Sequence, residues 1–163
     1  MSLIYRYLDA TGDGTGAKDF LTDYSSSAVV ARIAPAAGEV FMINRMLITI
    51  VDTLMTAGKY GGLTALTNGL TVGVSNAGGL LLDITDGIPI KTNAGWATLC
   101  FDVHVKRWGG TPDNDVLTAR FTFRKAGKAL GLNGDSGDYL WVRINDNMTG
   151  LIAHHFMAQG VIQ

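Results

Sequence analysis

The chain has 163 residues and a formal net charge of −1. This length suits one domain with one core, and the near-neutral charge excludes a broad electrostatic attraction to nucleic acid or to an anionic membrane. Charged residues make up only 17% of the chain, below the roughly 25% typical of soluble domains. We therefore expect part of the apolar surface to be covered by other copies of the chain or by a partner.

The single cysteine and the lack of a long apolar run argue against a disulfide-stabilised protein and against a secreted or helical membrane protein. The single cysteine, Cys100, cannot form an internal disulfide. The first ten residues lack the apolar core of a signal peptide, and no apolar run approaches the ~20 residues of a membrane helix. We expect synthesis in the cytosol and no membrane partner.

The first 24 residues are predicted to form an N-terminal arm or an edge strand, ahead of a single β-sandwich domain over residues 25–163. Tyr5 and Tyr7 lie in a short alternating pattern that is typical of a strand. The Gly-, Asp- and Thr-rich run at residues 9–16 lacks the alternating acids and the closing Glu of a calcium loop, so it is interpreted as a turn.

Alternating or continuous apolar runs, bounded by Gly, Pro, Asn and Asp, predict about eight strands and no good helix. The runs lie at residues 28–33, 39–52, 70–75, 79–84, 96–107, 116–123, 138–145 and 151–163. The short Asn-Ala-Gly connection between residues 75 and 79 predicts a hairpin. Residues 53–69, 124–128 and 130–137 are expected to be loops or turns.

The longest run, residues 39–52, is apolar on both faces and rich in Ile, which favours a strand. One face should pack on the core and the other on a neighbour. Asn44 and Arg45 interrupt the pattern, so we expect a β-bulge there.

The stretch from Trp96 to Phe123 has the clearest alternation in the chain. Apolar side chains fall on one face at Leu99, Phe101, Val103 and Val105, and again at Leu117, Ala119, Phe121 and Phe123. A sheet with one apolar face needs a second layer packed against it. The predicted fold is therefore all-β: an antiparallel two-sheet sandwich, most simply a jelly roll of about eight strands. An immunoglobulin-like sandwich is the second choice, because its Cys…Trp…Cys signature is missing.

The side chains that could act in catalysis or bind a metal ion do not form a known catalytic pattern. Cys100, Asp102 and His104 would share one face of a strand. Alternate positions along a strand lie about 6.5–7 Å apart, which is too far for three side chains to bind one metal ion easily. We therefore interpret these residues as the polar outer face of the strand. His154 and His155 are adjacent and would point to opposite faces of a strand. We predict that the chain is not an enzyme and has no catalytic residue, metal site or cofactor.

Aromatic residues offer a binding alternative. Trp96, Trp108, Tyr139 and Trp141 could stack on sugar rings, although core or interface packing is the simpler reading. A carbohydrate-binding module, as part of a tail or fibre, is kept as the alternative function.

Four phrases carry a resemblance to a known class of proteins. They are L-T-N-G-L at residues 66–70, D-G-I-P-I-K-T-N-A-G-W at 86–96, G-D-Y-L-W-V-R-I-N at 137–145 and H-H-F-M-A-Q-G at 154–160. From about residue 39 to the end, the chain resembles virion structural proteins of tailed bacteriophages, in particular single jelly-roll capsid cement or decoration proteins, which commonly sit as trimers on the shell. The resemblance implies a capsid protein that bridges capsomers, with the major capsid protein and its own copies as partners, made in the bacterial host and located on the capsid surface.

Interface residues are predicted in the N-terminal arm and in the loops at 53–69 and 124–137, which should contact the capsid or other subunits. The candidates are Tyr5, Tyr7, Tyr60, Arg124, Lys125 and Lys128.

Overall fold

The computed structural model describes residues 2–10, 29–108, 114–127, 129–144, 146 and 150–163. These residues contain ten strands, one 3-10 turn and one helical turn. In chain order the elements are β1 (Ser2–Ala10), β2 (Val29–Ile33), β3 (Val40–Asp52), β4 (Leu70–Asn76), β5 (Gly79–Asp83), η1 (Asn93–Gly95), α1 (Trp96–Leu99), β6 (Asp102–Trp108), β7 (Asn114–Thr122), β8 (Leu130–Asn133), β9 (Tyr139–Ile144) and β10 (Ala153–Ile162).

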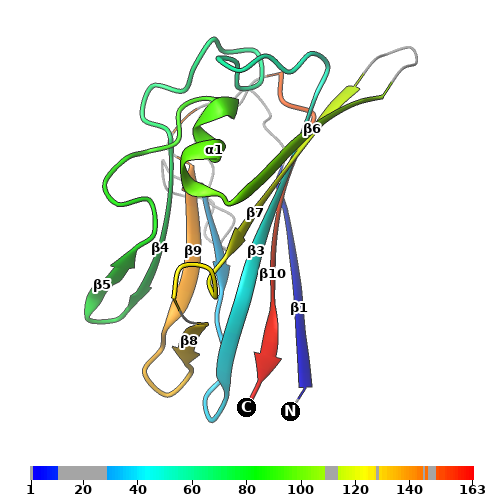
Figure 1. Ribbon diagram of the computed structural model, residues 1–163. Coiled ribbons are helices and arrows are strands. Elements are labelled where there is room, and N and C mark those ends of the chain that lie inside the picture. Colours follow the sequence, from blue (N-terminus) through cyan, green and yellow to red (C-terminus); the bar gives the residue numbers. More distant parts are fainter. Residues whose placement is uncertain (1, 11–28, 109–113, 128, 145, 147–149) are drawn as a thin grey trace.

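The strands form two antiparallel sheets. The larger has the order β1-β10-β3-β7-β6, with β8 also paired to β3, and the smaller has the order β2-β9-β4-β5 (Figure 1). The pairing is nested: β1 pairs with β10, β2 with β9, β3 with β7 and β8, and β4 with β5. A long hairpin rolled up in this way is a jelly roll. The prediction of an all-β, two-sheet jelly roll is confirmed.

Two strands add to the eight that were expected. β1 is the outer strand of the larger sheet, so the N-terminal segment takes the edge-strand form. β8 lies where a loop was predicted, and that prediction was wrong. Its four residues are too few to show a period, but they pair with residues 40–43 of β3 and bury Leu132 completely. Tertiary pairing, not local pattern, makes this strand.

The predicted bulge in β3 is confirmed. Arg45 pairs with Gln159, whereas Ile43 pairs with Gly160, which leaves Asn44 as the extra residue. The alternation of buried and half-buried residues changes phase at the same place. A Cβ atom at Gly160 would lie 2.1 Å from the carbonyl oxygen of Met42, so the close approach of the two backbones requires a glycine.

The strand predicted to begin at Trp96 begins instead at Asp102, after η1 and α1. The hydroxyl of Thr92 caps the first turn by accepting from the N–H of Gly95 at 3.2 Å. Trp96 is completely buried, so packing of the indole into the core overrides the alternating pattern. α1 lies at the upper end of the sandwich in Figure 1.

The two apolar faces of the Trp96–Phe123 stretch differ in how far they are buried. All four positions of the second run, on and just after β7, are buried, as predicted. In the first run, Phe101 and Val105 remain about half exposed, because β6 is the outermost strand of the larger sheet. The prediction that both runs pack against a second layer therefore holds fully only for the second.

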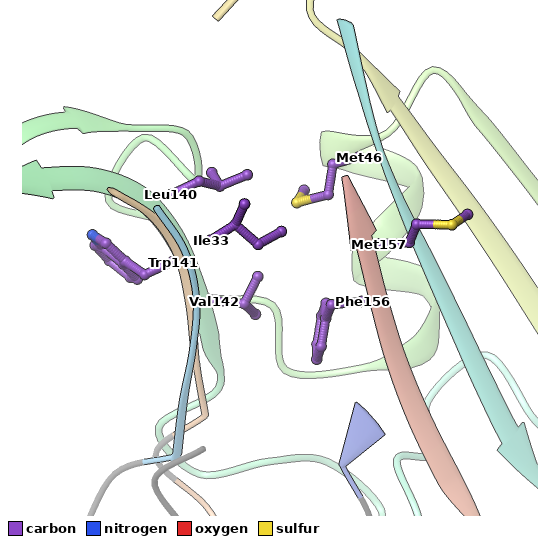
Figure 2. A pocket seen from close by; sticks show the side chains of 7 residues that line it. All are labelled: Ile33, Met46, Leu140, Trp141, Val142, Phe156 and Met157. Carbon is purple, nitrogen blue, oxygen red and sulfur yellow. The ribbon is translucent and has the colours of Figure 1, made fainter. Parts of the chain in front are cut away.

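The core lies between the sheets. Figure 2 shows Ile33, Leu140 and Val142 of the smaller sheet pointing toward Met46 and Phe156 of the larger one. In the same view, Trp141 and Met157 point away from the interior, as alternate positions on a strand require. The gap between these side chains holds only about 10 Å³ and is apolar, so it is a packing defect and not a ligand site. No helix among the described residues is long and apolar enough to cross a membrane.

Candidate interaction surfaces

Large apolar side chains are exposed along one edge of the smaller sheet. The exposed fractions are 60% for Leu80, 54% for Leu81, 45% for Leu82 and 71% for Ile88. The first three lie on β5, the outermost strand of its sheet, and Ile88 follows in the next turn. We call these four residues the leucine edge. A sheet edge also presents backbone N–H and C=O groups that no neighbouring strand satisfies, so it can accept another chain.

A groove of about 330 Å³ lies beside the leucine edge, between β5 and the β7–β8 region. Its lining is mostly apolar and includes Leu82, Ile84, Phe121, Phe123 and Leu130. Leu82 therefore belongs to both the edge and the groove, and the two form one continuous apolar surface. Such a surface marks a contact site for another macromolecule more often than a catalytic centre.

Among the described residues that line the groove, Asp83 is the only acidic one, and its carboxylate is already hydrogen-bonded. It accepts from the hydroxyl of Thr85 at 2.6 Å and from the backbone N–H groups of Thr85 and Gly87, both at 2.9 Å. The hydrogen bond from Thr85 is the main cause that lowers the pKa of Asp83. This carboxylate fixes the turn after β5 and offers no proton to a substrate at neutral pH.

The basic turn after β7 presents two of the predicted interface residues. Arg124 and Lys125 are exposed, and the ammonium of Lys125 lies 5.8 Å from the centre of the Phe101 ring. Lys128 lies outside the described residues. Tyr5 and Tyr7 are on β1, and the structure describes the backbone there but not these side chains.

Tyr60 is a correction to the predicted interface. Its side chain is completely buried, and its hydroxyl lies 3.0 Å from Nε2 of His154. The ring also packs edge-on against that imidazole, with centroids 5.7 Å apart. The prediction failed because residues 53–69 were treated as one exposed loop, whereas this segment closes one end of the core and turns its only tyrosine inward.

His154, like Tyr60, is a completely buried titratable group. Beyond Tyr60, its imidazole contacts the rings of Trp96 and Phe156, with centroids 6.3 and 4.3 Å apart. Burial, reinforced by the neighbouring His155, lowers the pKa of His154 to about 3. The side chain is therefore neutral at physiological pH and acts as a hydrogen-bonded core residue.

The constellation of Cys100, Asp102 and His104 is not assembled. Cys100 ends α1 and is buried, which raises the pKa of its thiol to about 12. Asp102 instead pairs with His104 on its own strand and with Arg120 on β7, 3.3 Å away. Across the described ranges, no group of three or more His, Cys, Asp or Glu residues is placed to hold a metal ion.

Two buried carboxylates that the sequence did not reveal fix the loops at the end near His154. Asp146 accepts from the backbone N–H groups of Thr67, Asn68 and Gly69. Asp115 accepts from the N–H of Met55 at 2.9 Å. These partners are 60 or more residues apart in the chain, so no local pattern could have paired them.

Arginine side chains cover the aromatic residues on the smaller sheet. Arg32 lies over the Tyr139 ring at 4.2 Å and Arg143 over Trp141 at 5.1 Å. Trp141 is buried and its indole N–H donates to the hydroxyl of Ser75 at 2.9 Å. Since Trp96 is also buried, neither of these tryptophans offers an open face, and the side chain of Trp108 lies outside the described residues.

Comparisons with protein-family models, curated proteins and solved structures found no match to this chain.

Proposed function

We propose that the chain is a non-enzymatic structural protein of a tailed-bacteriophage virion. It decorates the capsid and stabilises the shell by bridging capsomers as a homotrimer. Its partners are the major capsid protein and its own copies.

The observation that carries this proposal is an exposed apolar sheet edge with an adjoining groove, on a jelly roll in which three carboxylates hold loops of the same chain. The carboxylates of Asp83, Asp115 and Asp146 are all bonded to nearby backbone N–H groups. A binding protein that works by surface contact needs rigidity and contact area, whereas an enzyme needs polar groups that converge on a pocket. The four phrases that resemble phage virion proteins support the same proposal.

The proposed mechanism is mechanical. A protein that binds only the assembled shell shifts the equilibrium toward that state by mass action, without any chemical step. The tightly packed core between the two sheets supplies a body that does not deform when it spans two capsomers. The basic turn with Arg124 and Lys125 is the proposed contact with acidic groups of the shell, since both side chains are exposed.

Cryo-electron microscopy of the virion, combined with mass spectrometry of purified heads and tails, tests the location. The proposal expects density on the outside of the capsid and the chain in the head fraction. Its confinement to tails, or its absence from virions, would refute the proposal.

A charge-reversal pair tests the shell contact. R124E combined with K125E is expected to weaken binding to purified expanded shells at least tenfold, measured by co-sedimentation. K91E, which reverses another exposed lysine, is the matched control and should bind like the wild type. Equal binding by all three proteins would remove the basic turn from the interface.

A further inference from the structure

We infer that Arg32 and Arg143, on the outer face of the smaller sheet, form a binding site for an acidic segment of a partner protein. In that segment, two carboxylates lie at alternate positions of an extended chain. The inference goes beyond the proposed function and does not depend on it. The site is separate from the basic turn after β7, because its two arginines lie on β2 and β9.

The first argument is the position of the two arginines in the sheet. β2 and β9 are neighbouring antiparallel strands, and Arg32 pairs with Trp141. Arg143 lies two residues further along β9, so the two arginines are diagonal neighbours on one face of the sheet. Trp141 points away from the interior in Figure 2, and both arginines are exposed, so this face is the outer one.

The second argument is that both guanidinium groups are held in place but lack an acidic partner. The Arg32 guanidinium lies 4.2 Å from the centre of the Tyr139 ring. The Arg143 guanidinium lies 5.1 Å from the centre of the Trp141 ring. A cation–π contact restrains a long side chain without using its N–H donors. Among the residues that the structure describes, neither guanidinium pairs with a carboxylate, so its N–H donors are available to an added anion.

The ring beneath Arg143 is itself fixed by the sheet. The indole N–H of Trp141 donates to the hydroxyl of Ser75 at 2.9 Å. The same ring lies against Gly73 of β4, where an added Cβ atom would be 2.5 Å from it, so only a glycine leaves room for the ring. The donors of Arg143 are therefore presented from a pre-organised position, which lowers the cost of ordering the side chain on binding.

The third argument identifies the occupant by charge and spacing. Two positive groups that share a face repel another positive surface, including the same face of a second copy, and attract an acidic one. Diagonal neighbours in an antiparallel pair are about 7–8 Å apart, and side chains at alternate positions of an extended chain repeat about every 6.5–7 Å. A segment with acidic residues at such positions can place one carboxylate on each guanidinium, in the bidentate geometry that arginine favours.

A nucleic-acid backbone fits this site less well than an acidic protein segment. Proteins that bind single-stranded nucleic acid combine positive charge with open aromatic faces on which bases stack. Here the arginines occupy faces of the Tyr139 and Trp141 rings, and the formal net charge of the chain is −1. The observations favour a protein segment, and an oligonucleotide serves as the competing ligand in the test.

Fluorescence anisotropy with labelled peptides tests the site. The probe is an extended Thr- and Val-rich peptide with two Glu residues at alternate positions. The control peptide has the same composition with the two Glu residues adjacent, so that their side chains point to opposite sides. The wild type should bind the probe about tenfold more tightly, the change expected from the loss of one charge-assisted hydrogen bond. A single-stranded oligonucleotide of the same net charge should not compete.

Substitutions of the arginines locate the site on the sheet. R32Q and R143Q should each weaken binding of the probe about tenfold, and the double variant should not bind it measurably. K91Q removes another exposed positive charge and should bind like the wild type. Circular dichroism and urea unfolding establish that each variant is folded.

Three results with the wild type would overturn the inference: no binding of the probe, equal binding of both peptides, or preference for the oligonucleotide. Equal binding by the wild type and the double variant would also overturn it. The inference and the capsid role fail separately. Peptide binding by a chain that is absent from capsids would sustain the inference and remove the capsid role, whereas a shell-bound chain that does not bind the probe would do the reverse.

Discussion

Two regions of the molecule reverse the usual placement of polar and apolar groups. At the end closed by residues 53–69 and α1, the interior holds polar side chains, namely His154, Asp52, Asp115 and Asn93. At the leucine edge, the exterior holds large apolar ones. A buried polar group is tolerated because specific hydrogen bonds satisfy it, whereas an exposed apolar patch is relieved only by contact with another molecule. The first region should therefore determine stability, and the second should determine association.

The largest effect is expected from W96A in the polar interior. Trp96 is completely buried, and truncation of a buried tryptophan to alanine typically costs about 3–5 kcal/mol. Urea unfolding would measure this loss. W96F keeps an aromatic ring against His154 and should lose clearly less, so an equal loss in both variants would show that the indole is not a specific part of this packing.

The next effect is expected from D146A, which removes the acceptor for three consecutive backbone N–H groups at residues 67–69. Hydrogen bonds to a charged group contribute about 1.5–3 kcal/mol, and buried donors left without a partner add to the loss. We expect a loss of about 3 kcal/mol in urea unfolding. D138A removes a less buried carboxylate that accepts from Asn76 and Asn133, and should cost less than D146A.

A pH dependence of intermediate size is expected from His154. Its folded pKa of about 3 lies below the ordinary value near 6.5, so the unfolded chain binds a proton more readily and acid favours unfolding. The contribution to stability is complete above pH 6.5 and falls toward pH 3, by about 2 kcal/mol at pH 5. Unfolding free energies measured from pH 7 to pH 4 would reveal this slope.

Two glutamine substitutions test whether His154 causes this dependence of the unfolding free energy on pH. H154Q has no imidazole to protonate, so its stability should fall less steeply with acid, even if it is lower at pH 7. H155Q retains His154 and should keep the slope. A slope that persists unchanged in H154Q would show that other groups cause the acid sensitivity.

The smallest effect on stability is expected at the leucine edge. The double substitution L80S and L82S alters side chains that are 60% and 45% exposed, so the unfolding free energy of the monomer should change by less than about 0.5 kcal/mol per site. Association should weaken at the same time, as measured by sedimentation velocity. A large loss of stability with unchanged association would reverse the assignment of roles to the two regions.

Local patterns predicted most of the strands because apolar and polar residues alternate along a half-buried strand. The hairpin of β4 and β5, the bulge at Asn44 and the buried face of β7 are all confirmed. The candidate surface was less predictable. Arg124 and Lys125 are exposed as expected, but Tyr60 is not, and the leucines of β5 were interpreted only as a strand.

The sequence by itself determined that this chain forms paired antiparallel strands, since the alternation of side chains is a property of neighbouring residues. Only the tertiary structure decided which strands became edges, that β8 joined β3, and that Trp96 left the strand pattern to enter the core. Exposure is decided by what packs against a residue from elsewhere in the chain. The leucines of β5 would be core residues if a second sheet covered them. Because β5 is the outermost strand of its sheet, they lie on the surface.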